Sequence, residues 1–102
     1  MTNADRDLYA GLIRLHVLHH AGSRPIFGHW MVTELARHGY HLSAGTMYPL
    51  LHGLERKGYL RSSRRLDDGR DRRMYEITPA GRRALKAARN KVRELFGEMF
   101  ED

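Results

Sequence analysis

The stretch LSAGTMYPLLHGLERKGYL, residues 42–60, decides the fold predicted for this 102-residue chain. Ser43 is a preferred helix N-cap residue, and Gly58 is suited to the position just past a helix end. Between them, apolar residues recur at the spacing of one helix face, namely Met47, Leu50, Leu51 and Leu54. The opposite face carries small or polar residues: Gly45, Thr46, Tyr48, Pro49, His52 and Arg56. The stretch therefore predicts an amphipathic helix whose polar face another molecule can approach closely.

The residues before this stretch predict two more helices. Residues 5–20 carry apolar side chains at steps of three or four, with Ile13 widening a stripe formed by Leu8, Leu12, Leu15 and Leu18. Gly22, Ser23 and Pro25 then break the pattern. Residues 27–38 predict a second helix, with Phe27, Trp30, Met31 and Leu35 on one side. Gly39 is suited to end this helix.

The residues after it predict a hairpin and a final helix. Residues 59–66 and 72–78 have strand character, and the turn DDGRD at 67–71 joins them. Thr78-Pro79 is an N-cap followed by proline at the first helical position, and the helix continues to about Phe100. The predicted fold is mainly α with a small β-hairpin, a winged helix-turn-helix plus a C-terminal dimerisation helix. We expect residues 1–78 to form a winged-helix DNA-binding domain and residues 79–102 a dimerisation helix, within one structural unit.

Composition excludes several classes of function. The chain has no cysteine, so disulfides and thiolate chemistry are absent. It has no G-x-S-x-G, P-loop or H-E-x-x-H motif, which predicts no enzyme activity, no catalytic residue and no cofactor. No apolar run approaches the roughly 20 residues that span a bilayer, and the polar N-terminus is unlike a signal peptide. We therefore expect a cytoplasmic protein with no membrane partner.

The charge points to nucleic acid. Lys and Arg together number 18 against 12 Asp and Glu, for a net charge of +6, and 15 of the 18 are Arg. Six of these arginines lie within residues 61–73. Hairpin arginines can follow phosphates or enter a narrow minor groove, although charge also protects an exposed strand from aggregation. The best candidates for contacts from this wing are Arg64, Arg65, Arg70 and Arg72.

Two segments resemble one family. Residues 42–60 are similar to the central signature of the PadR family of bacterial transcriptional regulators, and RRMYEITPAGRRAL, residues 72–85, resembles its second wing strand and C-terminal helix start. The single short C-terminal helix matches the shorter subtype. The resemblance implies a homodimer that binds a palindromic operator in double-stranded DNA, usually as a repressor, and that a small-molecule effector releases. The Gly-Tyr pair that the family carries in its second helix is replaced here by Gly28-His29, and the last helix of this chain lacks a Trp.

The polar face of the 43–57 helix is the expected DNA reader. Its candidate contacts are Ser43, Thr46, Tyr48 and His52, which can reach phosphates or base edges. An ordinary solvent-exposed face is the simpler interpretation of the same residues. A winged-helix protein-interaction module without DNA binding is the alternative function, and salt-insensitive retention on DNA would favour it.

The last helix carries a coiled-coil-like apolar seam. We predict that it forms the dimer interface through Leu85, Ala88, Val92, Leu95, Phe96 and Met99. Packing on the first helix of the same chain is the alternative. An effector entering between that helix and the dimer helices would meet Tyr9, Leu12, Trp30, Val92 and Phe96, although each of these is explained equally well as core or interface.

Histidine is abundant, at seven residues. His16 and His20 are one helical turn apart and can bridge a metal ion. No acidic or thiolate partner is near them in the sequence, so solvent-facing histidines are the simpler interpretation. The sequence predicts no metal site, and a metal-responsive regulator using these histidines stays an alternative.

Overall fold

The N-terminal segment forms two helices where one was predicted. The structure, a computed structural model, describes residues 1–101. Helix α1 spans Asn3–Leu8 and α2 spans Ala10–Ser23. The continuous helix predicted over residues 5–20 is wrong at Tyr9, whose backbone leaves helical geometry with φ −95° and ψ 7°. The Tyr9 ring packs edge-on against Tyr40, with 5.8 Å between ring centroids, so a long-range aromatic contact accompanies the break.

Helices α3 and α4 form the helix-turn-helix. Helix α3 spans Gly28–Arg37, and α4 spans Ala44–Arg56. The predicted cap of α4 is confirmed, because the Ser43 hydroxyl accepts a hydrogen bond from the Thr46 amide at 3.3 Å. Gly39 and Gly58 follow the two helices with φ of +88° and +81°, values that glycine adopts without strain. Local sequence thus determines where both helices end.

The wing is a two-stranded antiparallel hairpin with a tight turn. Strand β1 spans Leu60–Asp67 and β2 spans Arg70–Ile77, with Leu60 opposite Ile77 and Asp67 opposite Arg70. Both strands continue closer to the turn than predicted, and the five-residue turn shrinks to Asp68-Gly69, with φ of 53° and 77°. An Asp-Gly pair favours this turn because both residues tolerate positive φ. Ile26 adds an isolated bridge to Tyr75, through backbone bonds of 2.9 and 2.7 Å.

The hydrophobic core lies among α2, α3, α4 and the base of the hairpin. On α2 the buried face carries Ile13, Val17 and Leu18, so the predicted stripe is right at Ile13 and Leu18 and wrong at Leu8 and Leu12, which are 73% and 44% exposed. A stripe read from spacing alone cannot identify which of two apolar faces meets the body. The largest fully buried side chains are Tyr75, Ile13, Ile26, Met31, Leu35, Met47, Leu51, Leu60 and Val17.

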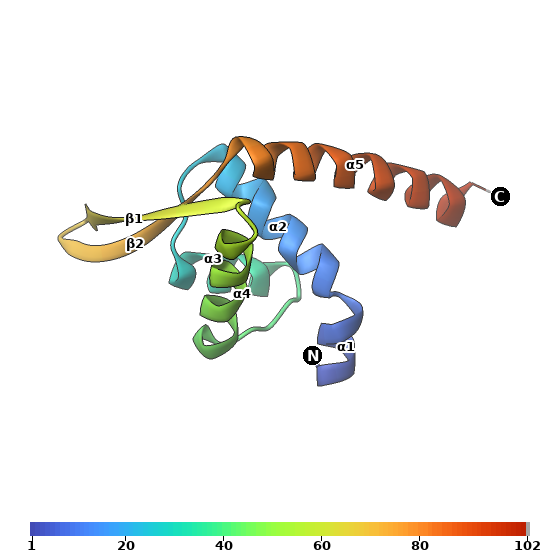
Figure 1. The fold of residues 1–102 in the computed structure, drawn as a ribbon. Coiled ribbons are helices and arrows are strands. Elements are labelled where there is room, and N and C mark those ends of the chain that lie inside the picture. The colour runs from blue at the N-terminus through green and yellow to red at the C-terminus, as the bar shows by residue number, and fades with distance from the viewer. Residues whose placement is uncertain (102) are drawn as a thin grey trace.

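Helix α5 extends away from this core. It spans Pro79–Phe100, and the Thr78 hydroxyl caps it by accepting from the Gly81 amide at 3.0 Å, as the Thr-Pro pair predicted. Figure 1 shows α5 leaving the body on the side opposite to the hairpin. Asp102, the last residue of the predicted segment 79–102, lies outside the described residues. The mainly helical winged-helix fold is confirmed. Within residues 1–101, no helix is long and apolar enough to cross a membrane.

Candidate nucleic-acid interface

Helix α4 exposes the face that was predicted to read DNA, with one exception. Tyr48 and His52 are one turn apart on this face, and both are exposed. Ser43 is exposed at the N-terminus of the helix. Thr46 is half-buried and borders a groove beside α1, so it does not share the face of Tyr48 and His52. The physical reason is the helical period. Each residue turns an α-helix by 100°, so Thr46 points about 200° away from Tyr48, which is two residues later.

Neighbouring elements hold the two aromatic side chains of this face. The Tyr48 ring lies on Gly28, the first residue of α3, yet remains 42% exposed. The His52 ring lies 6.4 Å, centroid to centroid, from the ring of the buried Tyr75 in β2. Burial raises the pKa of Tyr75, which keeps its hydroxyl protonated at neutral pH. The α4 face is therefore braced by α3 on one side and by the wing on the other.

The four predicted wing arginines do not lie alike. Arg64 and Arg65 have side chains 66% and 47% exposed, and Arg70 is exposed next to the turn. The Arg72 side chain is only 22% exposed, and its guanidinium lies 3.9 Å from the centre of the Phe27 ring. The Asp67 carboxylate is 3.4 Å from Arg72 Nε. Arg72 thus fastens the wing to the segment before α3, which the sequence pattern did not indicate.

Acidic residues of the wing lie beside the other arginines. Arg64 donates a hydrogen bond to Asp71 at 3.0 Å, and Arg61 donates one to Glu76 at 2.9 Å. Arg65 is 3.9 Å from the same Glu76 carboxylate. Exposed pairs of this kind contribute only about 0–1 kcal/mol each, so the arginines can exchange these partners for phosphates at low cost.

The predicted dimer residues form a continuous stripe on α5. Leu85 packs against the core, and Ala88 is half-buried. Beyond them the apolar side chains become exposed, from 44% for Val92 to 52% for Leu95, 59% for Phe96 and 62% for Met99. The rings of Phe96 and Phe100 lie 4.8 Å apart. The described chain therefore leaves the distal half of this seam uncovered.

An open groove of about 680 Å³ separates α2 from α5. Three of the five predicted effector residues line it, namely Leu12, Val92 and Phe96. Tyr9 and Trp30 do not belong to its lining. Tyr9 packs on Tyr40, and Trp30 packs against the core with the Arg24 guanidinium 4.9 Å from its ring centre. Tyr9 and Trp30 are therefore held by contacts with α3 or with the segments on either side of it. The sequence pattern could not show where these segments lie relative to α5.

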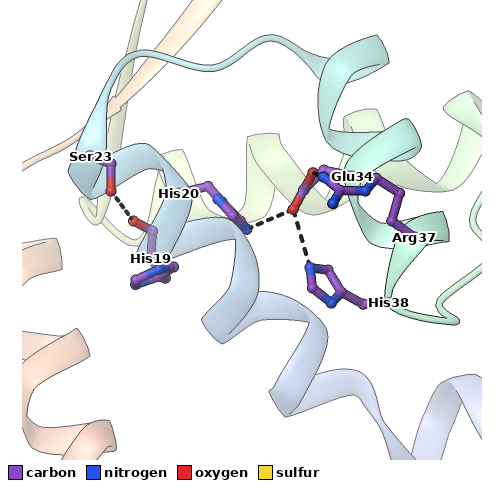
Figure 2. A network of polar contacts seen from close by, with 6 residues as sticks. All are labelled: His19, His20, Ser23, Glu34, Arg37 and His38. Carbon is purple, nitrogen blue, oxygen red and sulfur yellow. Dashed lines mark hydrogen bonds and ion pairs between the residues drawn. The ribbon is translucent and has the colours of Figure 1, made fainter.

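His20, one of the two histidines considered for a metal, has partners that the sequence interpretation missed. His20 on α2 lies 3.6 Å from the Glu34 carboxylate on α3, and His38, just past α3, lies 3.1 Å from the same oxygen. Arg37 pairs with the other oxygen of Glu34 at 2.8 Å (Figure 2). Glu34 and His38 are four residues apart, a spacing that predicts contact on a helix. Their approach to α2 is a long-range contact that spacing does not reveal.

The pKa values in this cluster follow from burial and from neighbouring charges. Burial lowers the pKa of His16, and the positive charges of His38 and His20 act in the same direction. Burial also lowers the pKa of His20, against the opposing effect of Glu34. Desolvation acts to raise the pKa of Glu34, but the hydrogen bond from His38 and the charge of Arg37 bring it below its ordinary value. At neutral pH, His16 and His20 are therefore neutral beside an ionised carboxylate.

A helix-turn-helix with a basic hairpin beside its second helix defines the class of winged-helix transcriptional regulators. The family model described as "Transcriptional regulator PadR-like family" matches residues 17–87. The chain therefore belongs to the PadR-like family, and it is a transcriptional regulator and not an enzyme. Membership implies regulation through DNA binding.

Relatives and solved structures agree with this assignment. The chain is 49% identical over 95 residues to transcriptional regulator Rv3488 of Mycobacterium tuberculosis, covering 93% of this chain and 89% of the relative. A PadR family transcriptional regulator from Eggerthella lenta is 31% identical with a TM-score of 0.77, over 93% of this chain and 87% of that one. A Streptococcus transcriptional regulator reaches a TM-score of 0.83 at 26% identity, over 97% and 95% of the two chains.

Proposed function

We propose that the protein is a cytoplasmic, homodimeric repressor that binds a palindromic DNA operator. A small apolar effector then releases the repressor from this operator. In this arrangement α4 enters the major groove, the wing follows the adjacent phosphates, and α5 joins the two subunits. Two recognition helices related by a twofold axis would enter successive major grooves, about 34 Å apart.

The observation that carries DNA binding is the presence of two like-charged cross-strand pairs in the wing. Arg64 lies opposite Arg73, and Arg65 lies opposite Arg72. Like charges directly opposite each other destabilise a hairpin, by a few tenths of a kcal/mol to about 1 kcal/mol per pair. Carboxylates beside Arg64, Arg65 and Arg72 offset part of this repulsion in the free wing, and a polyanion alongside the wing adds attraction and releases counterions. The wing sequence is thus suited to binding a polyanion.

The α4 face supports direct contact with base edges. A major groove admits one helix, and the side chains at its surface must leave room for close approach. Tyr48 and His52 offer a hydroxyl and a ring nitrogen, while Gly45 and the half-buried Gly53 add no bulk. Ser43 and the first amides of α4 lie where phosphate contacts position a recognition helix.

The exposed seam of α5 supports the homodimer. Val92, Leu95, Phe96 and Met99 expose between 44% and 62% of their surfaces along one face. An apolar face of this extent on a small domain is a mark of an interaction site. Because the seam has coiled-coil spacing, a second copy of α5 can cover it by knobs-into-holes packing.

The groove between α2 and α5 supports release by an effector. Its lining is mostly apolar and includes side chains from both helices, such as Leu12, Leu15 and Phe96. A ligand between these helices changes the angle of α5 to the body, and hence the spacing of the two recognition helices. An effector acts through its different affinities for the two spacings.

Selection of bound fragments from a random duplex library tests the proposal, with sedimentation equilibrium measured on the same preparation. We expect an enriched palindrome whose half-sites lie one helical turn apart, together with a dimeric mass. A monomer, or a library without an enriched palindrome, overturns the proposal. Weak retention that salt does not change would instead support a winged-helix module for protein interaction.

A further inference from the structure

Three histidines from two elements converge outside the DNA-binding surfaces. His16 and His20 lie on α2, and His38 directly follows α3. Each residue offers one ring nitrogen, and these three atoms all lie within 4.8 Å of one another. The His16 and His38 rings are 5.0 Å apart between centroids, and the His16 and His20 rings stack at 6.3 Å. Their approach brings imidazoles of α2 against the imidazole at the end of α3.

A half-buried carboxylate lies between two of these imidazoles. Oε2 of Glu34 is 3.6 Å from Nε2 of His20 and 3.1 Å from Nε2 of His38. Figure 2 shows both rings directed at this oxygen from opposite elements, with Arg37 on the other side of the carboxylate. The Glu34 side chain is only 11% exposed. The cluster therefore combines imidazole nitrogens with one carboxylate.

These distances suit a tetrahedral metal centre. Metal–nitrogen and metal–oxygen bonds of about 2.0–2.2 Å place neighbouring ligand atoms roughly 3.3–3.5 Å apart. The two contacts of Glu34, at 3.6 and 3.1 Å, already bracket that separation. The nitrogens of the three histidines, which lie within 4.8 Å of one another, would close to the same spacing by rotation of the imidazoles when the ion binds. Imidazole ligands with a carboxylate suit zinc, copper and nickel, whereas magnesium and calcium prefer all-oxygen sites.

We propose that His16, His20 and His38, completed by the Glu34 carboxylate, bind a divalent transition-metal ion of the zinc class. The ion takes the place of the direct contacts that Glu34 now makes with His20 and His38. It links α2, which packs on α5, to the end of α3, which leads into the recognition helix. Metal binding is then expected to change the affinity for DNA, a consequence that rests on the proposed function.

The first test measures zinc binding by the untagged, chelator-treated full chain, using calorimetry and thermal unfolding. We expect one ion per chain and a rise of several degrees in Tm. His16→Gln and His38→Gln should weaken binding by about tenfold or more. His29→Gln is the matched control, because His29 lies exposed at the opposite end of α3 from His38. Absence of zinc binding, or equal affinity in all three variants, overturns the site.

A second measurement does not depend on how the variants fold. Cobalt(II) added to the wild-type chain should give the visible absorption of a tetrahedral nitrogen and oxygen site, and zinc should remove it. A spectrum of hydrated octahedral cobalt would overturn the site even if the histidine variants failed to fold.

A third arm separates the site from the proposed function. Duplex binding is measured with and without zinc for the wild-type chain and for His38→Gln. A zinc-dependent shift of several-fold in the wild type alone supports regulation by metal. Unchanged DNA affinity in a chain that binds both zinc and DNA overturns the regulatory consequence and leaves the site standing. Loss of DNA binding under all conditions contradicts the proposed function instead.

Discussion

The Tyr48 ring of the recognition helix rests on Gly28, the first residue of α3. A Cβ at residue 28 would lie 2.8 Å from Cε1 and 2.9 Å from Cζ of Tyr48. Carbon atoms in favourable contact are about 3.5–4.0 Å apart, so no other residue fits at 28 unless the ring moves. Because Tyr48 is still 42% exposed, Gly28 determines where one candidate DNA contact points.

We expect Gly28→Ala to lower operator affinity about tenfold, equal to about 1.4 kcal/mol, because the new methyl group displaces the Tyr48 ring. Fluorescence anisotropy with the selected duplex measures the change. A double-mutant cycle with Tyr48→Ala provides the control, since the methyl group meets no ring in that background. Should Gly28→Ala weaken binding equally with and without the ring, the contact would have no bearing on recognition.

Local signals predicted most of the fold. Ser43, Thr78 and Gly39 act through atoms a few residues away, so their roles as caps and stops follow from sequence. The break at Tyr9 coincides with a contact to Tyr40, which is 31 residues further along the chain, and no periodicity reveals it. The predicted turn at 67–71 contains the observed Asp68-Gly69 turn, but both strands continue closer to that turn than predicted.

The candidate sites were predicted less completely, because each depends on which helix faces meet. Arg72 has the same sequence signature as the other wing arginines, yet Phe27 captures its side chain. Trp30 was assigned to the effector space, but α3 turns it toward the core. His16 and His20 were recognised as a pair, whereas Glu34 and His38 joined them only through the packing of α3 on α2.

The wing arginines should separate into two groups. Arg64→Ala, Arg65→Ala and Arg70→Ala should each lower the salt slope of DNA binding by up to about one unit, because each removes a phosphate contact. Their stability should stay within about 0.5 kcal/mol, as is usual at exposed positions. Binding measured at four or more salt concentrations gives the slope. If affinity and slope were unchanged for all three variants, the wing would not contact the backbone.

Arg72→Ala should act mainly through folding. Loss of the contact between its guanidinium and the Phe27 ring, 3.9 Å apart, should cost about 1 kcal/mol of unfolding free energy. Urea unfolding measures this cost, and Arg70→Ala is the control in the same strand. An Arg72 variant as stable as Arg70→Ala, with a reduced salt slope, would return Arg72 to the group of phosphate contacts.

Leu95→Arg should convert the protein into a monomer. Leu95 is 52% exposed in one chain, so the substitution costs that chain little, whereas a paired seam would have to bury the new charge. Sedimentation equilibrium should give about one chain mass, 11.9 kDa, for the variant and twice that mass for the wild type. Asn90→Arg is the control because it adds the same charge on the opposite face of α5. Dimers that survive Leu95→Arg would place the interface elsewhere.

Gly81 should be the least replaceable glycine of the chain's helices, because the first turn of α5 packs there against the base of the wing. A Cβ at residue 81 would overlap the carbonyl oxygen of Tyr59 and lie 2.7 Å from Cγ1 of Ile77. The overlap involves backbone, which cannot rotate away, so Gly81→Ala should cost about 1–3 kcal/mol or more. Gly11→Ala offers the matched comparison, since nothing lies within 4 Å of a Cβ at that position in α2. There alanine should gain up to about 1 kcal/mol from its higher helix propensity.

Urea unfolding compares the two glycine variants directly. Both are measured at the same protomer concentration, because dimerisation adds to stability. The free energy of unfolding should be lower than that of the wild type for Gly81→Ala, and equal to it or higher for Gly11→Ala. Since the Thr78 hydroxyl holds the Gly81 amide at 3.0 Å, the same substitution should also shift the direction in which α5 leaves the wing. A Gly81→Ala protein as stable as the wild type would mean that α5 is not seated on Tyr59 and Ile77.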